Sequence, residues 1–155
     1  MARPAAQTDP ALTSSLAALA SSIEGDVRTD RLSRAIYATD ASIYEIVPDA
    51  VVLPRTVDDV AATVRHCAAH ELAVTPRGAG TGLAGGAVNR GLQLDCSRYL
   101  DRILHIDPQA RTARVEPGVV LDELNAAVRP HGLQFGPDVA TSSRATLGGM
   151  IANNS

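Results

Sequence analysis

The spacing of apolar residues along the chain predicts alternating helices and strands. Apolar residues recur every three or four positions in several stretches, and we expect helices at residues 12–23, 30–38, 57–70 and 119–130. Short β-branched or alternating segments predict strands at residues 50–53, 73–75, 92–95, 103–107 and 112–116. The chain therefore carries signals for both element types, with no internal repeat.

The order of these elements predicts a fold class. Residues 50–75 follow the order strand, helix, strand, which is typical of a parallel βαβ unit with a right-handed crossover. Residues 103–107 and 112–116 alternate with period two around a Pro-Gln-Ala turn, which predicts a hairpin. We expect an α+β fold, in which a small parallel βαβ sheet packs with a mixed or antiparallel sheet.

Two positions predict where helices begin and end. Thr56 precedes the helix expected at 57–70 and is followed by Asp58 and Asp59 in its first turn, where acidic side chains favour the helix dipole. Gly132 follows the helix expected at 119–130, where a left-handed residue commonly ends a helix.

Composition limits the classes of partner. The chain has 155 residues, 45% of them hydrophobic, and a net charge of −3, which gives no electrostatic reason to expect a nucleic acid. No apolar run approaches the roughly 20 residues of a membrane span, so we expect a cytoplasmic protein, with peripheral attachment at the inner membrane left open. Cys67 and Cys96 lack metal-ligand spacing, and we expect reduced thiols and no metal site.

The most informative segment is rich in glycine. Residues 76–86 contain five glycines and lie between the strands expected at 73–75 and 92–95. A loop with so few side chains can turn its backbone N–H groups inward and form a concavity for an anion. The segment therefore predicts a site for a phosphate-bearing cofactor.

Two familiar phosphate motifs do not account for this segment. Residues 80–85 fit G-x-G-x-x-G, but a turn and a strand follow them, and the Rossmann mechanism needs a helix there. A nucleotide P-loop needs a lysine, and all fourteen basic residues of this chain are arginine. We expect a strand–loop–strand geometry for the anion site.

Five motifs in order resemble a known family. They are Pro54-Arg55-Thr56, residues 77–82, Val115-Glu116-Pro117-Gly118, Gly136-Pro137-Asp138, and residues 145–154. This order resembles the FAD-binding (PCMH-type) domain of the vanillyl-alcohol oxidase / p-cresol methylhydroxylase family, and within it the FAD-linked 2-hydroxyacid dehydrogenases. The resemblance covers residues 45–155. It implies an incomplete PCMH-type domain, truncated at its C-terminal end, preceded by an N-terminal helical extension at residues 1–44.

The resemblance implies FAD as the cofactor and two segments that contact it. The first wraps the pyrophosphate and the second lies along the ribityl chain and pyrophosphate. The implied positions are Arg77, Gly78, Ala79, Gly80, Thr81, Gly82, Gly86 and Ala87 in the first segment, and Pro137, Asp138, Ser142, Thr146, Gly148 and Gly149 in the second. Relatives that attach FAD covalently use a histidine near Thr81, and none lies between His70 and His105, so we expect non-covalent FAD.

The resemblance also implies an activity. It is the oxidation of a small 2-hydroxy acid of the D-lactate, glycolate or D-2-hydroxyglutarate type to the 2-oxo acid, with electrons passing to an iron–sulfur module or a quinone. The catalytic residues of the family lie beyond the matched motifs, so none is assigned here. Two alternatives stay open: another FAD-linked oxidase or reductase on this fold, and a non-catalytic module that binds a phosphate ligand or a partner protein.

Overall fold

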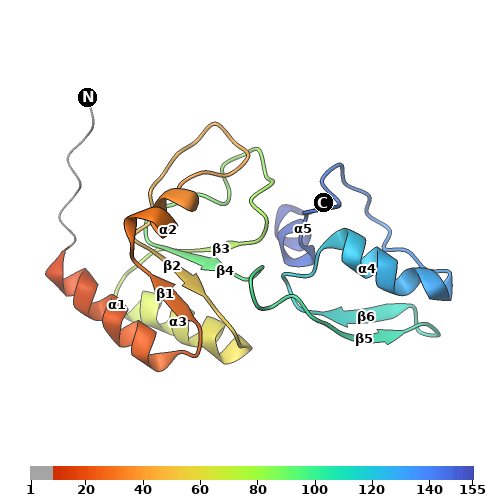
Figure 1. The fold of residues 1–155 in the computed structure, drawn as a ribbon, viewed down its shortest axis with the longest axis horizontal. Coiled ribbons are helices and arrows are strands. Elements are labelled where there is room, and N and C mark those ends of the chain that lie inside the picture. Colours follow the sequence, from red (N-terminus) through yellow and green to blue (C-terminus); the bar gives the residue numbers. More distant parts are fainter. Residues whose placement is uncertain (1–8) are drawn as a thin grey trace.

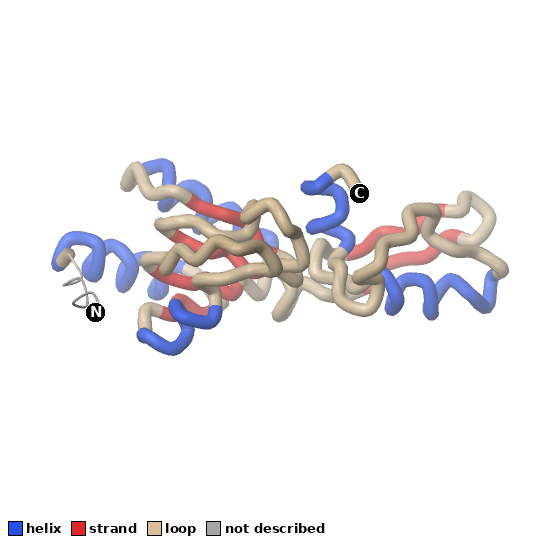
Figure 2. Tube along the Cα trace, turned by 90° about the horizontal axis from the view of Figure 1, so that it is seen from above, coloured by secondary structure: helices blue, strands red, loops and turns tan. Residues whose placement is uncertain are grey.

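The computed structural model describes residues 9–155, which form two lobes placed end to end (Figures 1 and 2). The first lobe holds α1 (Pro10–Ser22), β1 (Asp26–Arg28), α2 (Arg31–Ile36), β2 (Ala50–Leu53), α3 (Val57–Ala69), β3 (Val74–Arg77) and β4 (Leu92–Asp95). The second lobe holds β5 (Ile103–Asp107), β6 (Thr112–Val115), α4 (Leu121–Val128), η1 (Arg129–His131) and α5 (Leu147–Asn153). Both views place α5 at the junction of the lobes.

The first lobe is built on a four-stranded sheet with the order β1-β2-β4-β3. β2, β4 and β3 are parallel, and β1 pairs antiparallel with β2. The second lobe carries the antiparallel hairpin of β5 and β6. The expected α+β fold with parallel and antiparallel strands is confirmed, and the structure adds that β4 lies between the two strands of the predicted βαβ unit.

The core of the first lobe joins the N-terminal helix to the sheet. Leu16 and Leu19 of α1 pack with Leu92 of β4 and Cys67 of α3, and all four side chains are buried. The boundary that the sequence places at residue 45 therefore lies within a packed unit, because β1 and α1 precede it and share this sheet and core.

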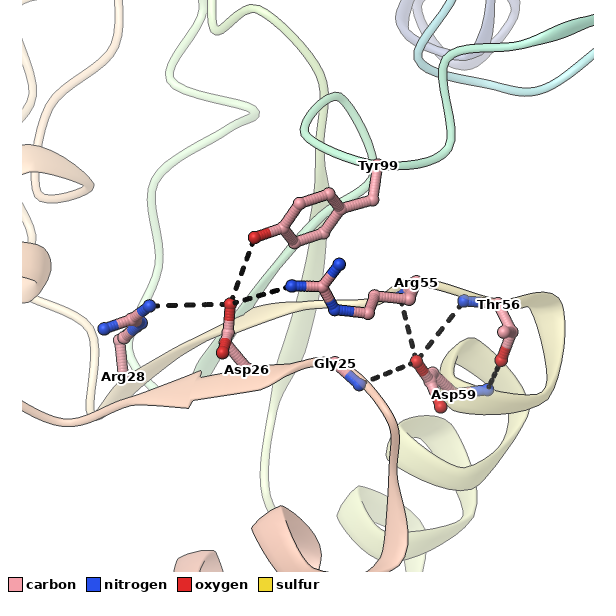
Figure 3. Close-up of polar contacts among 7 residues, drawn as sticks. All are labelled: Gly25, Asp26, Arg28, Arg55, Thr56, Asp59 and Tyr99. Carbon is pink, nitrogen blue, oxygen red and sulfur yellow. Dashed lines mark hydrogen bonds and ion pairs between the residues drawn. The ribbon is translucent and has the colours of Figure 1, made fainter.

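The start of α3 is fixed by the predicted cap. The Thr56 hydroxyl accepts a hydrogen bond from Asp59 N, and the Asp59 carboxylate accepts from Arg55 N at 2.8 Å and from Gly25 N at 3.0 Å (Figure 3). The same carboxylate also accepts from Glu24 N at 2.9 Å. Burial acts to raise the pKa of Asp59, but these N–H donors outweigh it and lower the pKa. One carboxylate thus caps α3 and fixes the chain entering β1.

The second lobe packs the hairpin against α4. Val119, Leu124, Val128 and Leu147 form its buried cluster. The helix expected at 119–130 is shorter than predicted, because a 3₁₀ turn that contains Pro130 follows Val128 and ends at Gly132, whose φ of 69° confirms the predicted left-handed position. Two elements were not predicted: the short strand β1 and the helix α5.

Candidate cofactor site

The glycine loop, residues 78–86, leaves the C-terminal end of β3 and returns the chain toward β4. Gly80 and Gly85 have φ values of 68° and 74°, in the left-handed region that disfavours other residues. Gly91, at the end of the return, has a φ of 85°, and a Cβ atom there would overlap the carbonyl of Ala73. Glycine therefore suits all three positions, because it adopts these conformations without strain.

Within residues 9–155, the backbone donors of the glycine loop have no partner. Among residues 9–155, no hydrogen bond uses a backbone N–H of residues 78–86 as its donor. The loop is held through its carbonyls instead: Gly80 O accepts from Ala41 N at 2.9 Å, and Gly85 O accepts from Val88 N at 3.4 Å. A run of unpaired N–H groups presents partial positive charge, which suits an anion.

Arg77 lies at the start of the glycine loop, and its guanidinium is occupied by carbonyl oxygens. It donates to Thr39 O at 2.7 Å, Ala87 O at 3.1 Å and Tyr37 O at 3.3 Å, and lies 5.1 Å from the centre of the Tyr37 ring. A Cβ atom at Gly80 would come within 2.8 Å of this guanidinium. The resemblance implies that Arg77 contacts the cofactor. In the structure, its guanidinium bonds backbone carbonyls on either side of the loop.

Ala87 closes the loop, and both of its backbone groups are paired. Its carbonyl accepts from Arg77, and its N–H donates to Asp40 Oδ2 at 3.3 Å. Asp40 Oδ1 also accepts from Ser42 N at 2.8 Å. Burial acts to raise the pKa of Asp40, but the hydrogen bonds from Ser42 and Ala87 outweigh it and the pKa is lowered. Asp40 therefore stays ionised beside the loop at neutral pH.

The two predicted segments meet at one contact. A Cβ atom at Gly78 would overlap the hydroxyl of Thr146, so the first segment lies directly against the second there. Thr146 is buried and caps α5, its hydroxyl accepting from Gly149 N at 3.3 Å. A Cβ atom at Gly82 would lie 3.8 Å from Asn153 Nδ2, so the end of α5 also faces the loop.

The glycines of the second segment have partners within the protein. Gly148 N donates to Pro117 O at 2.9 Å, and a Cβ atom at Gly148 would lie 2.6 Å from Pro117 Cβ. Gly149 N donates to the Thr146 hydroxyl at 3.3 Å. Packing against Pro117 is therefore enough to require Gly148, and the N–H groups of both glycines differ from the unpaired donors of the glycine loop.

The remaining predicted residues lie on the chain before α5. Pro137 and Asp138 are exposed, and Ser142 is half-buried with its N–H donating to Val139 O at 3.0 Å. In the described part of the chain, no hydrogen bond joins these three residues to the glycine loop. Within residues 9–155, the contact that joins the second segment to the first is the one between Thr146 and Gly78.

Sequence reasoning missed the residues that brace the loop from the N-terminal side. Residues 40–44 carry only a loop signal, yet Asp40 and Ala41 bond to the loop, and a Cβ atom at Gly85 would lie 2.5 Å from the Tyr44 ring. Most of these bonds involve backbone atoms, which leave no trace in residue identity. A polar Asp-Ala-Ser turn is the one signal present, and it is common in loops of every kind.

The glycine loop fits the pyrophosphate of FAD. Its N–H groups have no partner within residues 9–155, and a Cβ atom at Gly86 would meet no atom of these residues within 4 Å, so open space borders the loop. Residues 9–155 contain no group of three His, Cys, Asp or Glu side chains that could hold a metal ion. No helix in the same range is long and apolar enough to span a membrane.

Comparison with known proteins identifies the domain. The profile of a family described as the FAD binding domain matches residues 48–155. D-2-hydroxyglutarate dehydrogenase of Pantoea ananatis is 48% identical over 130 residues, 82% of this chain and 13% of that protein. Glycolate oxidase subunit GlcD of Bacillus subtilis is 38% identical over 125 residues, 79% of this chain and 26% of that protein.

A solved structure agrees with this match. p-Cresol methylhydroxylase aligns with a TM-score of 0.77 at 21% identity, over 96% of this chain and 30% of that one. At this identity the likeness establishes the fold alone, and the chain spans about an eighth to a third of the proteins it matches. The predicted resemblance is confirmed: the chain belongs to the FAD-binding domain family, with the fold of p-cresol methylhydroxylase.

Proposed function

We propose that the glycine loop binds the pyrophosphate of FAD through its backbone N–H groups. The observation that carries this proposal is the run of unpaired donors from Gly78 to Gly86. FAD carries two negative charges on its pyrophosphate, and several N–H donors in one run can share them. Arg77 supports the same site, because its guanidinium bonds the carbonyl of Ala87 at the end of the loop and the carbonyl of Thr39 in the segment beside it.

We place the second segment on the other side of the cofactor. Its contact with the first segment at Gly78 and Thr146 supports this placement, because a ligand on the glycine loop would lie near the start of α5. In this proposal Pro137, Asp138 and Ser142 approach FAD from the exposed chain before α5. The chain has no histidine between His70 and His105, which supports non-covalent binding.

For the whole protein we propose the oxidation of a 2-hydroxy acid to the 2-oxo acid. The names of the relatives support this substrate class, with D-2-hydroxyglutarate the first candidate and glycolate the second. Bound FAD supplies the two-electron acceptor, and residues 9–155 contribute its binding and orientation. An iron–sulfur module or a quinone would then take the electrons, in the cytoplasm or at the inner face of the membrane.

An absorbance spectrum of the whole purified protein, taken before and after acid precipitation, tests this proposal. We expect a flavin band that moves into the supernatant, and that bleaches when D-2-hydroxyglutarate is added without oxygen. L-2-hydroxyglutarate is the matched control, and glycolate and D-lactate test the wider class. A protein that binds no flavin even when FAD is added would contradict the proposal, and flavin in the pellet would contradict non-covalent attachment.

A further inference from the structure

The segment at residues 37–44 contacts both ends of the glycine loop. This segment precedes residues 48–155, which the family profile matches. Ala41 N donates to Gly80 O in the first half of the loop, and Asp40 accepts from Ala87 N at its end. A short stretch of chain thus fixes two points of the loop that lie seven positions apart in the sequence.

The Arg77 side chain links the same segment to the loop. Its guanidinium bonds the carbonyl of Thr39 in this segment and the carbonyl of Ala87 in the loop's last turn. It also lies over the Tyr37 ring, and the Tyr37 hydroxyl donates to the buried carboxylate of Asp95 at the end of β4. Burial and this carboxylate raise the pKa of Tyr37, so its hydroxyl keeps its proton at neutral pH.

These bonds bear on the affinity of the loop for an anion. A glycine-rich chain has many accessible conformations, and ordering it on binding would cost conformational entropy. Bonds to its carbonyls order the loop beforehand and leave its N–H groups free, which lowers that cost. The carbonyls of Gly80 and Ala87 are held by Ala41 and Arg77, so they are not available to face a phosphate.

We propose that Tyr37, Asp40 and Arg77 are positioning residues that hold the glycine loop in the shape that binds FAD. This inference rests on the proposed function of the loop. Asp40 offers a clear test, because charge and positioning predict opposite changes in FAD affinity when it is neutralised. A carboxylate near a pyrophosphate repels it, so charge alone predicts that neutralising Asp40 strengthens FAD binding. Positioning predicts the opposite, because Asp40 holds Ala87 N.

The Asp40→Asn variant of the whole protein separates the two effects. An asparagine oxygen can keep the bond to Ser42 N, while its NH₂ group cannot accept from Ala87 N. The matched control is Asp30→Asn, which removes the same charge from a cap of α2 whose carboxylate, among residues 9–155, bonds to Ser33. We expect the FAD dissociation constant to rise about tenfold in Asp40→Asn and to stay within about twofold of the wild type in Asp30→Asn.

A second measurement examines the loop without FAD. The described chain contains no lysine, so trypsin cuts it only after arginine, and the bond between Arg77 and Gly78 lies at the start of the loop. In the FAD-free protein we expect this bond to be cut about fivefold faster in Asp40→Asn than in the wild type or Asp30→Asn. Cleavage after the exposed Arg111 in the β5–β6 turn is the internal control and should not change.

FAD affinity and the cleavage rate after Arg77 together separate failure of the positioning role from failure of the proposed FAD binding. Equal or tighter FAD binding by Asp40→Asn, or an unchanged cleavage rate after Arg77, would overturn the positioning role. A wild-type protein that binds no FAD would contradict the proposed function instead, and the cleavage rate would still decide whether Asp40 holds the loop. Slower cleavage after Arg77 in Asp40→Asn would overturn the positioning role as well.

Discussion

Gly86 and Gly118 differ greatly in how much room the fold leaves for a side chain. A Cβ atom at Gly86 would meet no protein atom within 4 Å, whereas one at Gly118 would lie within 2.8 Å of three backbone atoms, including Cys96 O and Leu100 O. Neither residue has a φ in the left-handed region. The same residue type therefore serves an open loop at one position and a tight joint between the lobes at the other.

For Gly86→Val we expect a loss of FAD affinity with little change in stability. The protein itself has room for the added side chain, so any large effect on binding would come from the ligand. We expect the FAD dissociation constant, measured by flavin fluorescence, to rise at least about tenfold, because a branched side chain would intrude on the cofactor. Unchanged FAD affinity in this variant would place the pyrophosphate away from Gly86.

For Gly118→Ala we expect a loss of stability. Backbone atoms of residues 96–100 cannot move aside as a flexible side chain can, so the added methyl group should cost about 1 to 3 kcal/mol in the free energy of unfolding. Gly136→Ala is the matched control, because a Cβ atom there meets nothing within 4 Å. Urea unfolding of both variants would show the difference, and equal midpoints would contradict this packing argument.

Among the elements, α3 and β1 depend on one side chain. Asp59 is buried and accepts hydrogen bonds from the N–H groups that begin α3 and from two that precede β1 (Figure 3). Asp26 on β1 adds an ion pair with Arg28 and a hydrogen bond from Tyr99. The edge strand β1 is thus held by Asp59 of α3 and by Tyr99, as well as by pairing with β2.

We expect Asp59→Asn to lower the free energy of unfolding by about 2 to 3 kcal/mol at pH 7. Because the folded pKa of Asp59 is lowered from its ordinary value of 3.8, its contribution is present above that value and is lost as the pH falls through the folded pKa. The gap between wild type and variant should therefore close below about pH 4. Asp58→Asn, an exposed change in the same helical turn, is the control, and a gap independent of pH would contradict this role.

Local sequence patterns predicted most elements, and those they missed depend on distant partners. β1 contains Asp26, Val27 and Arg28, whose pattern is too short to signal a strand, and it becomes one by pairing with β2. α5 begins with Gly148 and Gly149 in its first turn, which local propensity disfavours, and the Thr146 cap and packing against Pro117 stabilise it.

The frame of the proposed site could likewise be predicted only in part. The glycine loop was visible because its composition leaves few other structural interpretations. The role of Arg77 at the start of the loop could not be predicted, because its guanidinium bonds the backbone carbonyls of Tyr37, Thr39 and Ala87. Residue identity specifies side chains, and it carries little information about which carbonyl a folded chain presents to them.

At the scale of the whole molecule, the proposed cofactor site lies where the two lobes meet. Gly78 of the first lobe touches Thr146 of the second, and α5 lies at the junction in both views (Figures 1 and 2). A ligand that contacts both segments would stabilise their relative placement by its binding energy.

The two cysteines report on the opening of the first lobe. Burial raises the pKa of Cys67, and burial together with the Asp95 carboxylate raises the pKa of Cys96 to about 11. At pH 8 we expect both thiols to react with iodoacetamide at least about a hundredfold more slowly in the native protein than in urea, as measured by mass spectrometry of their peptides. Rapid native labelling of Cys67 would contradict its place in the core.

Amide hydrogen exchange of the glycine loop, measured with and without FAD, tests the central claim most directly. Its N–H groups have no partner among residues 9–155, so peptides covering residues 78–86 should exchange quickly in the FAD-free protein and markedly more slowly with FAD. The β5–β6 hairpin at residues 103–115 should exchange at the same rate in both states. A protein that binds FAD, as shown by its absorbance, while residues 78–86 exchange at an unchanged rate would contradict the claim that this loop holds the cofactor.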